Sequence, residues 1–277
     1  MEMVKFEHTL FALPFAYTGA FLAGGGHLSF WKFIWITMAM ITARTAGMSL
    51  NRLIDKDLDA LNPRTASRAL PKGLIPTKTV WGLVAVSLAV FLFSTAMLNK
   101  LSLFLSPLAI LVLFAYSYLK RYTWLCHLGL GLVLACAPVG GWIAVAGRLG
   151  LVPVTLGAAV IFWLAGFDIL YACLDVEFDR QFGLFSVPQH FGVTRALWFS
   201  AVCHILTFGF LALTGVLAGL SWPYDVGLLL VGILLVYEHA VVSPDDLTRM
   251  NQAFFQANAI ISFLILASTL SALWVTS

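Results

Sequence analysis

The feature that most constrains this chain is a series of long apolar runs that follow one another from end to end. A helical run of about 20 apolar residues spans the hydrocarbon core of a bilayer. Lipid offers no hydrogen bonds to the backbone, so a spanning structure is either a helix or a closed barrel. The alternating polar and apolar residues of barrel strands are absent from the sequence. We therefore predict an all-α integral membrane protein.

The runs predict about nine transmembrane helices, packed as one bundle. Of the 277 residues, 61% are hydrophobic and only 10% are charged, and the mean hydropathy is +0.94. We expect residues 1–277 to form a single membrane-embedded domain. The predicted spans cover residues 9–26, 31–50, 79–98, 101–119, 124–146, 151–173, 195–218, 224–243 and 253–274.

Lysine and arginine are distributed unevenly between the two ends of these spans. If the N-terminus is cytoplasmic, the outer segments hold only Lys32, Lys100 and Arg148. Basic residues concentrate on the cytoplasmic side of membrane proteins, so this bias places the two long polar stretches, 51–76 and 175–195, in the cytoplasm. The net charge of +3 is too small to suggest a nucleic-acid partner. The inner segments hold Lys5, Arg52, Lys56, Arg64, Arg68, Lys72, Lys78, Lys120, Arg121, Arg180, Arg195 and Arg249.

Each polar stretch begins with carboxylates at helical spacing. Asn51, Asp55 and Asp59 are spaced i, i+4, i+8, so a helix that continued through all three would present them on one face. Asp175 and Asp179 repeat the i, i+4 step at the end of the sixth span. On the same helix, Asp57 and the basic pair Arg52 and Lys56 are expected to face elsewhere.

A longer polar pattern occurs twice and suggests an internal repeat. The spacing i, i+7, i+11 recurs at an offset of 124 positions in Arg44, Asn51 and Asp55, then in Asp168, Asp175 and Asp179. Arg44 would share the face of Asn51 and Asp55.

Paired carboxylates at helix ends suit the binding of divalent metal ions. Mg²⁺ prefers oxygen ligands and commonly keeps substrate phosphate in its coordination shell. Two acidic clusters that face each other repel, and metal ions bound to a diphosphate between them would remove that repulsion, with nearby basic residues neutralising the remaining charge. The alternative is that these are solvated loop carboxylates paired with lysine and arginine. The occurrence of two such motifs favours the metal site.

The motifs resemble those of the UbiA superfamily of intramembrane aromatic prenyltransferases. NRLIDKDLD matches the family's first acidic motif as N-xxx-D-xxx-D, and NPRTASRALPKG resembles its RTxxRPLPxG continuation. DVEFDRQFGLFSVPQHFG resembles the second motif and its tail. Two departures are Arg52, where the family commonly has Asp, and Ala69, where it commonly has Pro.

The resemblance implies a helical bundle around a central cavity, with the head of a polyprenyl diphosphate between the acidic motifs. It also implies Mg²⁺ as cofactor, with Asp55, Asp175 and Asp179 as catalytic carboxylates because the ions they hold assist departure of the diphosphate. The allylic cation would then be attacked by a ring carbon beside a phenol hydroxyl. The expected metal ligands are Asn51, Asp55, Asp59, Asp175 and Asp179.

Three basic residues are expected to bind the diphosphate. Arg64 and Arg68 lie in the loop after the first motif, and Lys120 closes the fourth span. For Lys120, the alternative is a positively charged anchor at the membrane surface.

Three residues before the motifs are expected to bind the aromatic acceptor. Arg44 lies within the second span, where an arginine is a functional candidate by default. It is expected to bind a substrate carboxylate or to pair with Asp168. Tyr171, one turn after Asp168, could stabilise the cation or contact the acceptor. The alternatives are a purely structural Arg44–Asp168 pair and a tyrosine that only fills space.

We therefore predict an enzyme that transfers a polyprenyl group to a 4-hydroxybenzoate-type acid in ubiquinone or menaquinone biosynthesis. An alternative acceptor is 1,4-dihydroxy-6-naphthoate. The predicted location is the bacterial inner membrane, with the active site on the cytoplasmic side. A cation-coupled transporter is the main alternative of another class, but it would place its charges near the midplane of broken helices. A CDP-alcohol phosphotransferase is disfavoured because its DG…AR…G pattern is not found.

Overall fold

The computed structural model describes residues 9–242 and 250–276, and these ranges contain helices without strands. Nine helices are long, and three α-helices and one 3-10 helix are short. The long helices are α1 (Thr9–Ala23), α2 (Phe30–Ile54), α4 (Thr77–Leu98), α5 (Lys100–Leu119), α6 (Cys126–Ala146), α7 (Leu151–Ala172), α10 (Val193–Ala218), α11 (Trp222–Val241) and α12 (Met250–Thr276). The short ones are α3 (Lys56–Leu61), η3 (Cys173–Asp175), α8 (Val176–Phe182) and α9 (Val187–Phe191).

The helices confirm the prediction of an all-α membrane protein. Among the described residues, 8 helical segments are long and apolar enough to cross a bilayer, and α1 adds a shorter apolar helix over Ala12–Ala23. Together they correspond to the nine predicted spans, with bounds that differ by a few residues. The polar stretches between α2 and α4 and between α7 and α10 form short helices and loops that connect the long helices.

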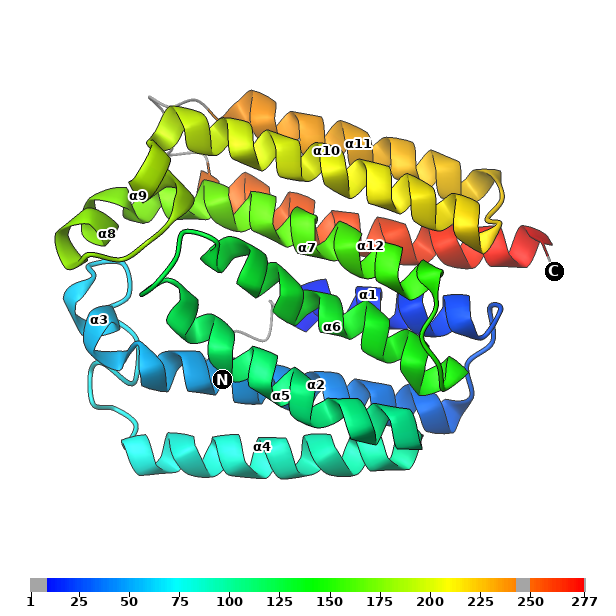
Figure 1. Ribbon diagram of the computed structural model, residues 1–277, viewed down its shortest axis with the longest axis horizontal. Helices are drawn as coiled ribbons and strands as arrows, with labels where there is room; N and C mark the ends of the chain where they lie inside the picture. Colours follow the sequence, from blue (N-terminus) through cyan, green and yellow to red (C-terminus); the bar gives the residue numbers. More distant parts are fainter. Residues whose placement is uncertain (1–8, 243–249, 277) are drawn as a thin grey trace.

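The long helices run side by side along one axis, and the short helices gather at one end of the bundle (Figure 1). α7 packs against α6 and α10, while α2 packs against α4 and α5, and α1 lies between α6 and α12. α3, which continues α2, and α8 and α9, which follow α7, meet at the same end. The fold therefore brings together two polar stretches whose first aspartates, Asp55 and Asp175, lie 120 residues apart in the sequence.

Glycines let the inner helices approach closely. A Cβ atom at Gly141 in α6 would lie 2.0 Å from the carbonyl oxygen of Ala16 in α1, and one at Gly19 would lie 2.0 Å from the carbonyl oxygen of Pro138. Lipid tails are as apolar as leucine, so helices in a membrane associate largely through such close packing of small residues. The same contact region holds Phe15 of α1 against Trp163 of α7, with ring centroids 5.1 Å apart.

Gly141→Ala should destabilise the protein, whereas Gly140→Ala should not. The alanine Cβ at position 141 would meet a backbone oxygen that cannot rotate away, and overpacking of this kind costs about 1–3 kcal/mol. Nothing lies within 4 Å of a Cβ at Gly140, so alanine there should gain up to about 1 kcal/mol of helix propensity. Thermal denaturation of both variants in the same detergent measures the difference. Equal midpoints would contradict the close approach of α1 and α6.

Candidate active site

Both acidic motifs begin at a similar bend in the backbone. Asp55 stands between α2 and α3 with φ −96° and ψ 6°, and Asp175 is the last residue of η3 and the N-cap of α8, with φ −108° and ψ 7°. The prediction of a continuous helix through Asp59 is therefore wrong. Backbone hydrogen bonds from Asp55 to Asn51 and from Asp59 to Asp55 nevertheless cross the bend.

The bends also correct the register of the proposed repeat. Asp55 corresponds to Asp175 and Asp59 to Asp179, an offset of 120 positions instead of 124. The i, i+7, i+11 spacing pairs residues by their polar character alone. The bends instead pair residues that have the same backbone conformation. Arg44 and Asp168 are consequently not equivalent: Arg44 precedes its bend by eleven residues and Asp168 precedes its bend by seven.

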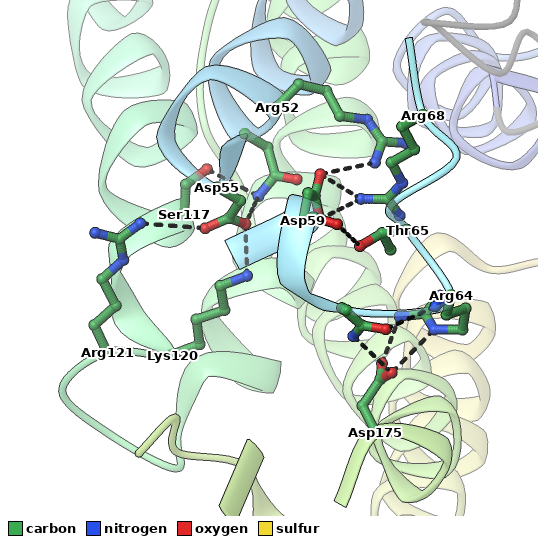
Figure 2. A network of polar contacts seen from close by, with 12 residues as sticks. Arg52, Asp55, Asp59, Arg64, Thr65, Arg68, Ser117, Lys120, Arg121 and Asp175 are labelled. Atoms are coloured by element: carbon green, nitrogen blue, oxygen red, sulfur yellow. Dashed lines mark hydrogen bonds and ion pairs between the residues drawn. The ribbon is translucent and has the colours of Figure 1, made fainter. Parts of the chain in front are cut away.

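Asp55 is buried and is surrounded by donors from two helices (Figure 2). Its Oδ2 accepts hydrogen bonds from Lys120 Nζ at 2.5 Å and from Asn51 Nδ2 at 3.1 Å. Arg121 Nη2 lies 3.5 Å from Oδ1 and donates to the carbonyl oxygen of Ile54 at 2.6 Å. The end of α5 thus supplies two cations to the first motif, where only Lys120 was expected.

Asp59 is buried between two arginines. Arg68 Nη1 lies 2.7 Å from both carboxylate oxygens, and Arg52 Nη1 lies 3.6 Å from Oδ2. Arg52 was expected to face elsewhere, and that expectation is wrong: Arg52 and Asp59 are seven residues apart, about two helical turns, so their side chains lie near one face. The backbone oxygen of Asp59 accepts a further hydrogen bond from Thr65 Oγ1 at 2.9 Å.

Asp175 joins the second motif to the loop that follows the first (Figure 2). Arg64 forms a two-pronged ion pair with it: Nε donates to Oδ1 at 3.0 Å and Nη2 contacts Oδ2. Asn62 Nδ2 donates to the same Oδ1 at 3.3 Å. Burial by itself would lower the pKa of Arg64, but the hydrogen bond and the negative charge of Asp175 outweigh it and raise that pKa. This pair links segments that come from opposite halves of the chain.

Asp179 differs from the other three carboxylates. Its Oδ2 accepts a hydrogen bond from Ser186 Oγ at 2.7 Å, and none of the described lysines and arginines forms an ion pair with it. Ser186 caps α9 by accepting from the backbone of Gln189. Asp179 therefore fixes the start of α9 and carries no direct cationic partner in this part of the chain.

The donor atoms fit Mg²⁺, although the protein alone does not complete a coordination shell. The predicted ligands offer carboxylate and amide oxygens, the atoms that this hard cation prefers. Within the described ranges, no three acidic, histidine or cysteine side chains converge on one point where a metal ion could sit. Mg²⁺ is commonly held by one or two carboxylates plus substrate phosphate, so the set suits ions that arrive with a diphosphate. The metal-binding role of these residues stays a prediction.

The residues expected to bind the acceptor do not form the predicted ion pair. Arg44 makes no ion pair with a carboxylate of the described chain, and its Nε is buried without a hydrogen-bond partner. Asp168 instead contacts His127, with Oδ2 2.7 Å from Nδ1. Tyr171 packs against Phe167, with ring centroids 4.8 Å apart. The expected Arg44–Asp168 pair is thus wrong, and Arg44 keeps an unused buried donor.

Three contributing residues were missed in the sequence. They are Asn62 and Arg121, which contact Asp175 and Asp55, and His127, which contacts Asp168. The available sequence signal for His127 was a polar residue at the start of an apolar span.

Comparisons with known proteins agree with this architecture. The model of the UbiA prenyltransferase family matches residues 12–265. A 4-hydroxybenzoate octaprenyltransferase of Xanthomonas campestris pv. campestris (strain B100) is 32% identical over 238 residues, which are 86% of this chain and 78% of the relative. The corresponding protein of Aeromonas salmonicida (strain A449) is 31% identical over 237 residues, 85% of this chain and 80% of that one.

Solved structures share the fold along nearly the whole chain. The apo structure of a UbiA homolog from Aeropyrum pernix K1 superposes with a TM-score of 0.87 at 36% identity, covering 95% of this chain and 96% of the other. A UbiA homolog from Archaeoglobus fulgidus bound to DMAPP and Mg²⁺ has the same fold, with a TM-score of 0.75 at 20% identity, covering 99% and 98%. The family model covers far more than half of the sequence, and the chain belongs to the UbiA prenyltransferase family.

Proposed function

We propose that this protein transfers a polyprenyl group from an allylic diphosphate to a hydroxylated aromatic acid, 4-hydroxybenzoate in the first instance, in quinone biosynthesis. The observation that carries the proposal is the cluster of carboxylates and cations that two distant helix ends build at one end of the bundle. The relatives named 4-hydroxybenzoate octaprenyltransferase support the choice of acceptor.

Arg64, Arg68 and Lys120 are proposed to bind the diphosphate. Each now neutralises a carboxylate of the two motifs, namely Asp175, Asp59 and Asp55. Mg²⁺ held by Asn51, Asp55, Asp59, Asp175 and Asp179 would supply positive charge that assists cleavage of the allylic C–O bond. The three basic side chains would then be free to turn to phosphate oxygens, which arginine binds through two parallel hydrogen bonds. The solved homolog with DMAPP and Mg²⁺ supports this choice of metal.

Arg44 is proposed to bind the carboxylate of the acceptor. A buried guanidinium nitrogen without a partner is costly, and a carboxylate would satisfy it with a charge-assisted hydrogen bond. Tyr171, near the end of α7 and four residues before Asp175, would lie between the acceptor and the diphosphate. A 1,4-dihydroxy-6-naphthoate acceptor carries the same carboxylate and remains the alternative substrate.

The apolar surroundings suit a reaction through an allylic cation. The long helices are apolar enough to lie in a bilayer, which we propose also delivers the polyprenyl chain. A central cavity between them would shield the cation from water, which would otherwise quench it. We place the protein in a bacterial inner membrane with this end in the cytoplasm, because the basic residues concentrate there. Carboxylates at one end of the bundle do not suit a cation-coupled transporter.

The proposed activity can be tested on membranes that contain the protein. Geranyl diphosphate and Mg²⁺ are supplied with 4-hydroxybenzoate or with 1,4-dihydroxy-6-naphthoate, and products are identified by mass spectrometry. We expect one prenylated acid and one equivalent of diphosphate. Absence of a prenylated product from either acid would refute the acceptor assignment.

Asp55→Asn and Asp175→Asn should each lower the rate of diphosphate release about 100- to 1,000-fold, the usual loss when one electrostatic stabiliser of a transition state is removed. Asp57→Asn is the matched control, since Asp57 lies in the same short helix region but is exposed. It should retain the wild-type rate. Full activity of either motif variant would contradict the proposed metal site.

Arg44→Lys should raise the KM for 4-hydroxybenzoate, because lysine cannot reproduce the two-pronged contact of arginine with a carboxylate. One charged hydrogen bond contributes about 1.5–3 kcal/mol, so the expected rise is about tenfold or more. Phenol, which lacks the carboxylate, should react equally poorly with both proteins. Arg148→Lys, an exposed arginine outside the site, serves as control. Unchanged KM values would show that Arg44 does not bind the acceptor carboxylate.

A further inference from the structure

Asp168 and His127 form a dyad outside the two acidic motifs. Asp168 Oδ2 lies 2.7 Å from His127 Nδ1, and His127 Nε2 lies 3.1 Å from the backbone nitrogen of Val187. The imidazole is almost fully buried, whereas 33% of the Asp168 side chain is exposed. The dyad therefore consists of a fixed, buried histidine and a carboxylate with one accessible side.

The backbone of Val187 determines where the imidazole carries its proton. A peptide N–H can only donate, so His127 Nε2 must be the acceptor of that hydrogen bond. The proton of the neutral ring is then on Nδ1, which donates to Asp168 Oδ2. The hydrogen bond from His127 fixes Oδ2 of Asp168, and Oδ1 forms no hydrogen bond with the described chain.

The position of Asp168 along the bundle matches the phenol end of the acceptor. Asp168 and Tyr171 lie about one turn apart in α7, and Asp175 ends the short helix η3 that follows it. With a rise of about 1.5 Å per residue, Asp168 lies roughly 10 Å from the bend at Asp175, and Arg44 lies roughly 16 Å from the bend at Asp55. Because both bends are at the same end of the bundle, Asp168 lies between the diphosphate site and Arg44. An acid with its carboxylate on Arg44 would extend its para hydroxyl towards Asp168.

We propose that Asp168 is the general base that removes the ring proton displaced by prenylation, and that His127 is a positioning residue that orients Asp168. This inference rests on the proposed prenyl transfer to a hydroxylated aromatic acid. Asp55, Asp59 and Asp175 are less suited to the task because each is paired with a cation, and Asp179 because it accepts a hydrogen bond from Ser186.

The step balances without a further reactant. The allylic C–O bond breaks, and its electron pair leaves with the diphosphate. A π electron pair from the ring carbon beside the phenol hydroxyl then forms the new C–C bond. The C–H electron pair of that carbon restores aromaticity, and its proton passes to Asp168 Oδ1. Asp168 returns to the carboxylate by releasing the proton to water before the next turnover.

The test uses 4-hydroxybenzoate with hydrogen or deuterium at ring positions 3 and 5. Asp168→Asn keeps the size of the side chain and an oxygen for His127, so the site should stay folded. We expect kcat to fall about 100-fold or more, the usual contribution of a general base. The KM for the acid should change little. A primary deuterium isotope effect on kcat, absent from the wild type, should appear because proton removal becomes rate-limiting.

Two substitutions at His127 separate positioning from packing. The amide of asparagine can replace the Nδ1 donor to Asp168, whereas glutamine reaches the Val187 backbone but leaves Asp168 without its donor. We expect His127→Asn to retain most of kcat and His127→Gln to show the slow, isotope-sensitive turnover of Asp168→Asn. A purely structural role would lower thermal stability in both variants without any isotope effect, and would overturn the inference.

The outcomes separate this inference from the proposed function. If the wild type prenylates none of the aromatic acids, both fail. If the wild type is active and Asp168→Asn keeps its kcat, only the base assignment fails, and the departing diphosphate becomes the proton acceptor. A rise in KM without an isotope effect would make Asp168 a binding residue and would equally refute the assignment.

Discussion

Repulsion between carboxylates is the constraint on which the site depends. Two helix ends bring four aspartates to one end of the bundle, and such an arrangement is unstable without compensating positive charge. Lys120 compensates Asp55, Arg68 compensates Asp59, and Arg64 compensates Asp175 across the two motifs. In the proposed function the same three cations would turn to phosphate oxygens once metal ions bind the carboxylates. One set of side chains would then balance the charge of the carboxylates without substrate and bind the diphosphate.

The membrane environment explains why close backbone contacts hold the long helices together. Helices in lipid gain little from burying apolar side chains against each other, and close contact between backbones takes over that role. Gly141 and Gly19 provide it between α1 and α6, where any larger residue would collide with a backbone oxygen. The rigid bundle keeps α2 and α7 at fixed relative positions. The depth of a residue in α2 or α7 can therefore be counted from the bend at Asp55 or at Asp175.

Along that depth the polar residues form an ordered series. The motif carboxylates and their cations lie at the end, Asp168 with His127 lies about two helical turns further in, and Arg44 lies deeper still. The proposed acceptor, with a phenol at one end and a carboxylate at the other, would fit this order with its reactive carbon towards the proposed diphosphate site.

The sequence by itself determined the helices and the chemical character of the site. Apolar runs fixed the spans because lipid permits no unpaired backbone, and the spacing of the aspartates identified two motifs at helix ends. The tertiary structure decided which charged side chains contact one another. The bend at Asp55 is a backbone geometry that the residue pattern did not predict, and the pairing of Arg64 with Asp175 joins segments from opposite halves of the chain. Likewise, Asp168 pairs with His127 instead of Arg44 because α6 and not α2 presents a donor to it. Such contacts depend on the distances between helices, and the spacing of residues along a sequence does not contain those distances.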